Sequence, residues 1–245
     1  MADTDSADIE ARFSALKSGV EARRLSFGLA ERRAMLAALR AAVLRNKAAI
    51  IGAIAEDFAK PESETLLTEI LPVLVEIDHA LKHLRRWMRP RRVAPALASF
   101  GTRASVRPEA RGLALILSPW NYPFSLAITP LISALAAGNA AILEPSELTP
   151  ATSALIARLV AETFPPELVT VIEGGKETAQ ALLGLPFDHI FFTGSPAVGR
   201  IVMARAADHL ASVTLELGGK SPTIVGPGAD IEAAAKWIAF GKFVN

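Results

Sequence analysis

One segment of the sequence has the residue types that bind phosphate groups at the start of a helix. Residues 191–200 read FFTGSPAVGR, in which a strand-like run passes through Gly194 and Ser195 into a predicted helix. Glycine lets a ligand approach the backbone, and the free N–H groups and positive dipole end of a helix favour a pyrophosphate. The Gly-x4-Gly spacing to Gly199 differs from the G-x-G-x-x-G dinucleotide fingerprint. An ordinary strand-to-helix turn therefore stays open as the alternative.

A carboxylate lies near the end of a second predicted strand. Residues 213–217 read VTLEL, and their alternation puts Thr214 and Glu216 on the face opposite the apolar residues. Glu216 is followed closely by two glycines, which suits a general base if its surroundings hold its pKa near the working pH. A solvated strand face is the competing interpretation.

An asparagine follows a third apolar run. Residues 118–124 read SPWNYPF and precede a predicted helix. The side-chain amide of Asn121 could donate a hydrogen bond to a developing oxyanion, a contribution typically worth about 2.7–4 kcal/mol when lost. Asn121 could equally be a turn residue that bonds its own backbone, and Trp120 a packing residue.

Bulk composition points to a folded chain whose partners bind at sites. The 245 residues are 51% hydrophobic and carry 26 basic against 25 acidic side chains, so no overall field draws the chain to nucleic acid. The acidic first ten residues lack the basic and apolar regions of a secretory signal, so we expect a cytoplasmic protein. Cysteine is absent, which leaves no thiolate as nucleophile or metal ligand.

An uncharged stretch covers residues 112–143 and is long enough to suggest a membrane span. Prolines, asparagines and glycine punctuate it, so we expect a buried strand, helix and strand and no membrane span.

The first third of the chain predicts helices. Apolar residues recur at spacings of three and four from residue 9 to 88, and Pro61 and Pro72 divide the region into about three helices. Arginines crowd the end of the last helix, where cations are favourable. His79 and His83 have helical spacing without an acidic partner, so we expect no metal site.

The remainder predicts an α/β fold with a Rossmann-like parallel sheet that carries the Gly-x4-Gly turn. Apolar runs at residues 113–117, 140–143, 169–172, 189–192 and 213–217 alternate with predicted helices at residues 124–137, 150–163, 176–183 and 197–210. We expect an N-terminal helical region at residues 1–94, an extended arm or hairpin at 95–111, a nucleotide-binding domain at 112–212 and the start of a further, largely missing domain at 213–245.

Five motifs, in order and spacing, give the sequence its resemblance to a known family. They are PWNYPF at residues 119–124, AGN at 137–139, PSELTP at 145–150, FDHIFFTGS at 187–195 and LELGGK at 215–220. Together they resemble the aldehyde dehydrogenase superfamily. Within it, the sequence looks most similar to the fatty or aromatic aldehyde branch that includes coniferyl aldehyde dehydrogenase.

The resemblance implies a function for each motif. Asn121 would be the oxyanion donor, Glu216 the general base that activates the hydrolytic water, and Trp120 part of the nicotinamide side of the cleft. Ser195 would hold the pyrophosphate, and Glu147 would bind the adenosine ribose. The expected cofactor-binding residues are Ser118, Trp120, Glu144, Glu147, Gly194, Ser195, Val198, Gly199 and Leu217.

One position departs from the family pattern. Relatives usually have lysine where this sequence has Glu144, and that lysine contacts the ribose or a 2′-phosphate. Two acids, Glu144 and Glu147, would repel a phosphate. We therefore expect NAD rather than NADP as the cofactor.

A second departure concerns the nucleophile. In the family a cysteine thiolate attacks the aldehyde, and that cysteine would lie just beyond the FVN of residues 243–245. We therefore expect an N-terminal portion of an aldehyde-oxidising enzyme that is inactive alone and homodimeric in its full-length form. The alternative is a genuinely short, inactive nucleotide-binding or dimerising protein, and the codons after Asn245 distinguish the two.

Overall fold

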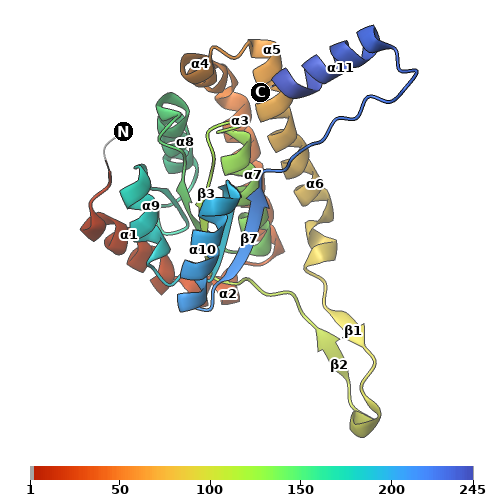
Figure 1. The fold of residues 1–245 in the computed structure, drawn as a ribbon. Coiled ribbons are helices and arrows are strands. Elements are labelled where there is room, and N and C mark those ends of the chain that lie inside the picture. The colour runs from red at the N-terminus through yellow and green to blue at the C-terminus, as the bar shows by residue number, and fades with distance from the viewer. Residues whose placement is uncertain (1–2, 245) are drawn as a thin grey trace.

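The computed structural model describes residues 3–244 and confirms the α/β fold predicted from the sequence. A five-stranded parallel sheet forms the centre, and helices cover both of its faces (Figure 1). Three of the strands are fully buried, which explains why their sequences read as continuous apolar runs rather than as alternating ones.

The sheet has the strand order β5-β4-β3-β6-β7. The chain runs outward through β3, β4 and β5, then returns to place β6 beside β3, so a topological switch point lies between β3 and β6. Ligands of such sheets bind beyond the carboxyl ends of the strands at that point. The strands are β3 (Leu113–Leu117), β4 (Ala140–Glu144), β5 (Val169–Val171), β6 (His189–Gly194) and β7 (Ser212–Leu217).

Two helical layers cover one face of the sheet. Helices α7 (Ser125–Ala137) and α8 (Pro150–Thr163) pack on the strands, and α3 (Leu29–Arg45), α4 (Lys47–Phe58) and α6 (Leu71–Trp87) pack on those helices. Helix α10 packs on β6 and β7 and contacts α9, which in turn contacts α1. The bounds of these and of the neighbouring helix are α1 (Ser6–Ser18), α2 (Val20–Ser26), α9 (Lys176–Leu183) and α10 (Pro196–Asp208).

The prediction that Pro72 divides the N-terminal helices was wrong. Helix α5 (Glu62–Thr65), the π-helical segment η1 (Leu66–Ile70) and α6 follow one another without a break, and Pro72 lies in the first turn of α6. The backbone N–H of Leu71 bonds the carbonyl of Leu66, five residues back, so the wider π turn accommodates the ring that would clash in a regular helix. The region still contains more helices than the three predicted, because the chain also breaks at Gly19, Gly28 and Asn46.

Two elements extend away from the body of the molecule (Figure 1). Strands β1 (Arg91–Val93) and β2 (Ala104–Val106) form an antiparallel hairpin with the short 3-10 turn η2 (Leu97–Ser99) between them. Helix α11 (Ile231–Phe243) buries no residue, and Trp237 and Phe240 on it are exposed. Within residues 3–244, no helix is long and apolar enough to cross a membrane.

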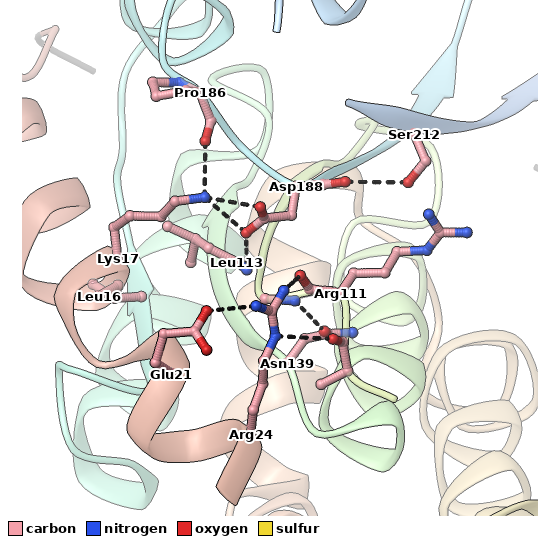
Figure 2. A network of polar contacts seen from close by, with 12 residues as sticks. Leu16, Lys17, Glu21, Arg24, Arg111, Leu113, Asn139, Pro186, Asp188 and Ser212 are labelled. Carbon is pink, nitrogen blue, oxygen red and sulfur yellow. Dashed lines mark hydrogen bonds and ion pairs between the residues drawn. The ribbon is translucent and has the colours of Figure 1, made fainter. Parts of the chain in front are cut away.

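A polar cluster fastens the N-terminal helices to the amino ends of the strands (Figure 2). The Lys17 ammonium at the end of α1 donates to both carboxylate oxygens of Asp188, at 2.9 and 2.8 Å, and to the carbonyl of Pro186 at 3.2 Å. Asp188 also accepts the backbone N–H of Leu113 at 2.8 Å, and its own carbonyl accepts from Ser212. One lysine and one carboxylate thus connect α1 to β3 and β6.

Candidate functional site

A cleft of about 730 Å³ lies at the carboxyl ends of β3, β6 and β7, next to the switch point. Its walls come from the three segments that the sequence singled out, together with one face of α7. The lining residues are Pro119, Trp120, Asn121, Leu126, Thr129, Pro130, Ser133, Phe191, Thr193, Gly194, Ser195, Glu216, Leu217 and Gly218. The fold therefore brings together residues that lie almost 100 positions apart in the chain.

The turn between β6 and α10 has the geometry of a helix start that faces the cleft. Ser195 is the N-cap of α10, and its hydroxyl accepts the backbone N–H of Val198 at 3.3 Å. A Cβ on Gly194 would overlap the ring of Phe192, so this turn accepts no side chain there without a shift. A Cβ on Gly199 would come within 2.9 Å of the Leu217 side chain, which shows that Gly199 allows α10 to pack closely on β7.

One buried hydroxyl in the cleft wall suits a polar ligand. Thr193 Oγ1 is shielded from solvent and finds no hydrogen-bond partner among residues 3–244. Buried polar groups are normally paired, because leaving one unpaired costs about 1–3 kcal/mol. An unpaired hydroxyl beside Ser195 and its helix start therefore fits a ligand with polar groups, such as a dinucleotide. Thr193 was not predicted from the sequence, because its burial depends on contacts that periodicity does not reveal.

The loop that carries Asn121 is held from behind by a buried ion pair. Lys60 Nζ lies 3.3 Å from Glu69 Oε1, and the two side chains are 5% and 0% exposed. Lys60 also donates to the carbonyl of Asn121 at 3.4 Å, and Glu69 Oε2 accepts the backbone N–H of Ser125 at 2.9 Å. Burial raises the pKa of Glu69, and the Ser125 N–H and the Lys60 ammonium oppose that rise.

Aromatic rings surround the same lysine. Its ammonium lies 5.3 Å from the centre of the Phe58 ring and 4.6 Å from that of Tyr122, both within cation–π range. Phe58 in turn stacks on Trp120, with ring centres 6.3 Å apart. Phe58 at the end of α4 and Lys60 just beyond it therefore pack against the aromatic residues on the two sides of Asn121.

An acidic group lies at the end of β4, outside the lining of the main cleft. Glu144 is 6% exposed, and burial together with the nearby carboxylates of Glu147 and Asp3 raises its pKa to about 8. Asp3 accepts the backbone N–H groups of Gly175 and Thr178 at the start of α9. Asp3 was not predicted as a neighbour of Glu144, because a residue so far from β4 in the chain gives no local signal.

The remaining predicted site residues lie in the cleft, at a strand end and in the first turn of α10. Glu216 is exposed and lines the cleft at the end of β7. Ser118 is buried, and both its backbone N–H and its hydroxyl donate to the carbonyl of Glu144, which joins the ends of β3 and β4. Val198 and Gly199 lie in the first turn of α10. Among the described residues no cluster of His, Asp and Glu could hold a metal ion.

The sheet order and the covering helices define a doubly wound α/β protein, and the cleft lies at the switch point where such folds bind their ligands. The family model of the aldehyde dehydrogenase family matches residues 1–245. The chain belongs to the aldehyde dehydrogenase family.

Similar proteins agree with this assignment. A probable coniferyl aldehyde dehydrogenase of Pseudomonas aeruginosa is 46% identical over 211 residues, which cover 86% of this chain and 44% of that protein. The substrate-bound state of Staphylococcus aureus AldH superposes with a TM-score of 0.91 at 42% identity, covering 96% of this chain and 51% of that one. A Mycobacterium tuberculosis aldehyde dehydrogenase complexed with NAD+ gives a TM-score of 0.86 at 29% identity, covering 98% and 50%.

The matches cover only part of each relative. The chain spans about half the length of the curated relatives it matches. The 245 residues of this chain form the cleft described above. They contain no cysteine.

Proposed function

We propose that this chain is the nucleotide-binding portion of an NAD-dependent aldehyde dehydrogenase that oxidises an aromatic or medium-chain aldehyde to its carboxylic acid. The observation that carries the proposal is the convergence of Asn121, Ser195 and Glu216 on one cleft at the switch point of the sheet. The named relatives include a coniferyl aldehyde dehydrogenase and an enzyme in complex with NAD+, which supports the substrate class and the cofactor. We further propose that the full-length enzyme is a cytoplasmic homodimer.

Four side chains of the cleft, and Glu147 outside its lining, have proposed tasks. Ser195 and the first N–H groups of α10 bind the pyrophosphate, while Trp120 borders the nicotinamide and Glu147 the adenosine ribose. The bound cofactor would accept a hydride from the substrate. When a thiolate from outside these 245 residues adds to the aldehyde carbon, the Asn121 amide would stabilise the oxyanion that forms on the aldehyde oxygen. After hydride transfer, Glu216 would take a proton from the water that cleaves the resulting thioester and releases the acid and the thiolate.

The substitution Ser195→Asp tests the nucleotide site. Aspartate caps a helix as well as serine does, so α10 and the melting temperature should be preserved. Its charge, however, would lie where the pyrophosphate binds, and we expect the NAD+ affinity of the chain to fall at least tenfold, about 1.4 kcal/mol. Isothermal titration of both proteins with NAD+ measures the change.

Ser195→Asn is the matched control, because it keeps the cap without adding a charge. Equal NAD+ affinities for the Asp and Asn variants would place the pyrophosphate elsewhere. Titration of the unmodified chain with NADP+ should give weaker binding than with NAD+, since the Glu147 carboxylate, joined by that of Glu144 above its pKa of about 8, would repel a 2′-phosphate at the proposed ribose position. NADP+ binding as tight as that of NAD+ would contradict the proposed preference.

A further expectation concerns activity. The purified 245-residue chain should produce no reduced cofactor from NAD+ and an aldehyde, because it contains no thiolate to form the covalent intermediate. The absorbance of the reduced nicotinamide, followed over time with and without the aldehyde, checks this result. A steady aldehyde-dependent rise that Glu216→Gln abolishes would show that the chain catalyses the oxidation without a cysteine.

A further inference from the structure

The buried pair of Lys60 and Glu69 has no task in the proposed reaction, yet it contacts the Asn121 loop at both ends. The ammonium bonds the carbonyl of Asn121, and the carboxylate bonds the N–H of Ser125, the first residue of α7. The loop between these two points is thus held to one rigid pair of side chains. Charged side chains are rarely buried in proteins unless they are paired, and the side chains of Lys60 and Glu69 are 5% and 0% exposed.

Each of the two contacts has an electrostatic reason. The N–H groups in the first turn of a helix lack intrahelical partners, and a carboxylate there also favours the helix dipole. Glu69 meets both demands of α7. The Lys60 ammonium lies over the rings of Phe58 and Tyr122, and the backbone carbonyl that it bonds is that of Asn121. The pair therefore fixes the backbone position from which the Asn121 side chain projects.

We propose that Lys60 and Glu69 are positioning residues that hold the Asn121 amide in the orientation required for binding an oxyanion. This inference rests on the proposed role of Asn121. A small displacement of such a donor is costly, because an oxyanion contact depends on distances within a few tenths of an ångström. The pair acts through the loop, without touching the substrate.

The structure offers a matched comparison at the opposite end of the sheet. There Lys17 also bridges a carboxylate and a backbone carbonyl, and Asp188 also accepts a backbone N–H (Figure 2). The two pairs have the same design, but only Lys60 and Glu69 contact the Asn121 loop.

The test uses the double variant Lys60→Met/Glu69→Gln of the whole chain. Replacing both charges together by neutral side chains of similar volume avoids leaving one charge buried, so the fold should persist. We expect hydrogen exchange at the backbone amides of residues 121, 122 and 124–126 to accelerate at least tenfold, and the Asn121 side-chain amide resonance to shift. Exchange in β3 should stay as in the unmodified chain.

The variant Lys17→Met/Asp188→Asn is the control. It should accelerate exchange near Leu113 and leave residues 121–126 and the Asn121 amide resonance unchanged. If the first double variant changes neither the exchange at residues 121–126 nor the Asn121 amide resonance, the pair does not position Asn121 and the proposal is overturned. It is also overturned if both double variants disturb the loop equally.

Lys60→Arg keeps the test decisive if the double variant does not fold, because it retains both charges and leaves neither buried alone. The guanidinium has a different shape, so its bond to the carbonyl of Asn121 should be displaced and exchange at residues 121–126 should rise more than in β3; an equal rise in both would refute positioning. NAD+ titration of the unmodified chain separates the two proposals. Absent NAD+ binding would count against the proposed function and leave the exchange result standing.

Discussion

Replacing Glu144 by glutamine is expected to make the folded chain more stable at neutral and mildly alkaline pH, with a gain that grows up to about pH 8. The pKa of this carboxyl rises from 4.5 to about 8 on folding, first because it is buried and then because Glu147 and Asp3 lie nearby. Between these two values the unfolded chain has lost the proton and the folded chain still holds it. The free energy of unfolding therefore falls as the pH rises through that window.

The size of the effect follows from the width of the window. One pH unit corresponds to a tenfold change in the folding equilibrium, so the whole interval amounts to on the order of 5 kcal/mol. Below the unfolded pKa both forms are protonated and the contribution vanishes. Urea unfolding of the two proteins at a series of pH values from about 5 to 9 measures the difference directly.

A second variant tests the cause of the shift. Glu147→Gln removes one of the two neighbouring carboxylates and leaves burial in place, so it should narrow the window without abolishing it. If the unfolding free energies of the unmodified chain and of Glu144→Gln run parallel over the whole pH series, Glu144 does not hold a proton in the folded state.

The strands and the sheet-covering helices are the part of the fold that local sequence determines. The run at residues 113–117 coincides with β3, because a strand covered on both faces must be apolar throughout. Pro72 shows where local rules fail: the π turn before it depends on how the helix packs, and a proline in isolation reads as a break.

The same limit applies to the site. The turn at Ser195 and the loop at Asn121 were predictable, because helix starts and strand ends have a recognisable composition. The burial of Glu144, the unpaired hydroxyl of Thr193 and the proximity of Asp3 were not. All three depend on residues far away in the chain.

Gly112→Ala is expected to destabilise the chain by about 3 kcal/mol. Gly112 has φ +138°, a conformation that L side chains rarely adopt, and a Cβ there would overlap the Asp188 carboxylate. That carboxylate cannot move away without releasing Lys17 and the N–H of Leu113. The backbone strain and the lost contacts therefore add. Chemical unfolding at constant pH measures the loss.

Gly52→Ala provides the opposite case with the same chemical change. Gly52 lies in the middle of α4, is exposed and has nothing within 4 Å of the position of a new Cβ. Alanine should stabilise the chain there by about 0.5–1 kcal/mol, because it restricts the unfolded chain and favours helix. A Gly112→Ala variant as stable as the unmodified chain would mean that residue 112 and Asp188 can relax apart at little cost.

The attachment of α1 also sets an order of events during synthesis. Lys17 and Asp188 are 171 positions apart, and Asp3 reaches Gly175 over 172. When the first helix leaves the ribosome, its binding surface has not yet been translated, so its apolar face must wait for most of the chain. The entropic cost of closing so long a loop is only a few kcal/mol larger than that of closing a short one. The contact can nevertheless form only after residue 188 has been synthesised. Helix α1 is therefore synthesised well before its partners and can dock only after they have been made.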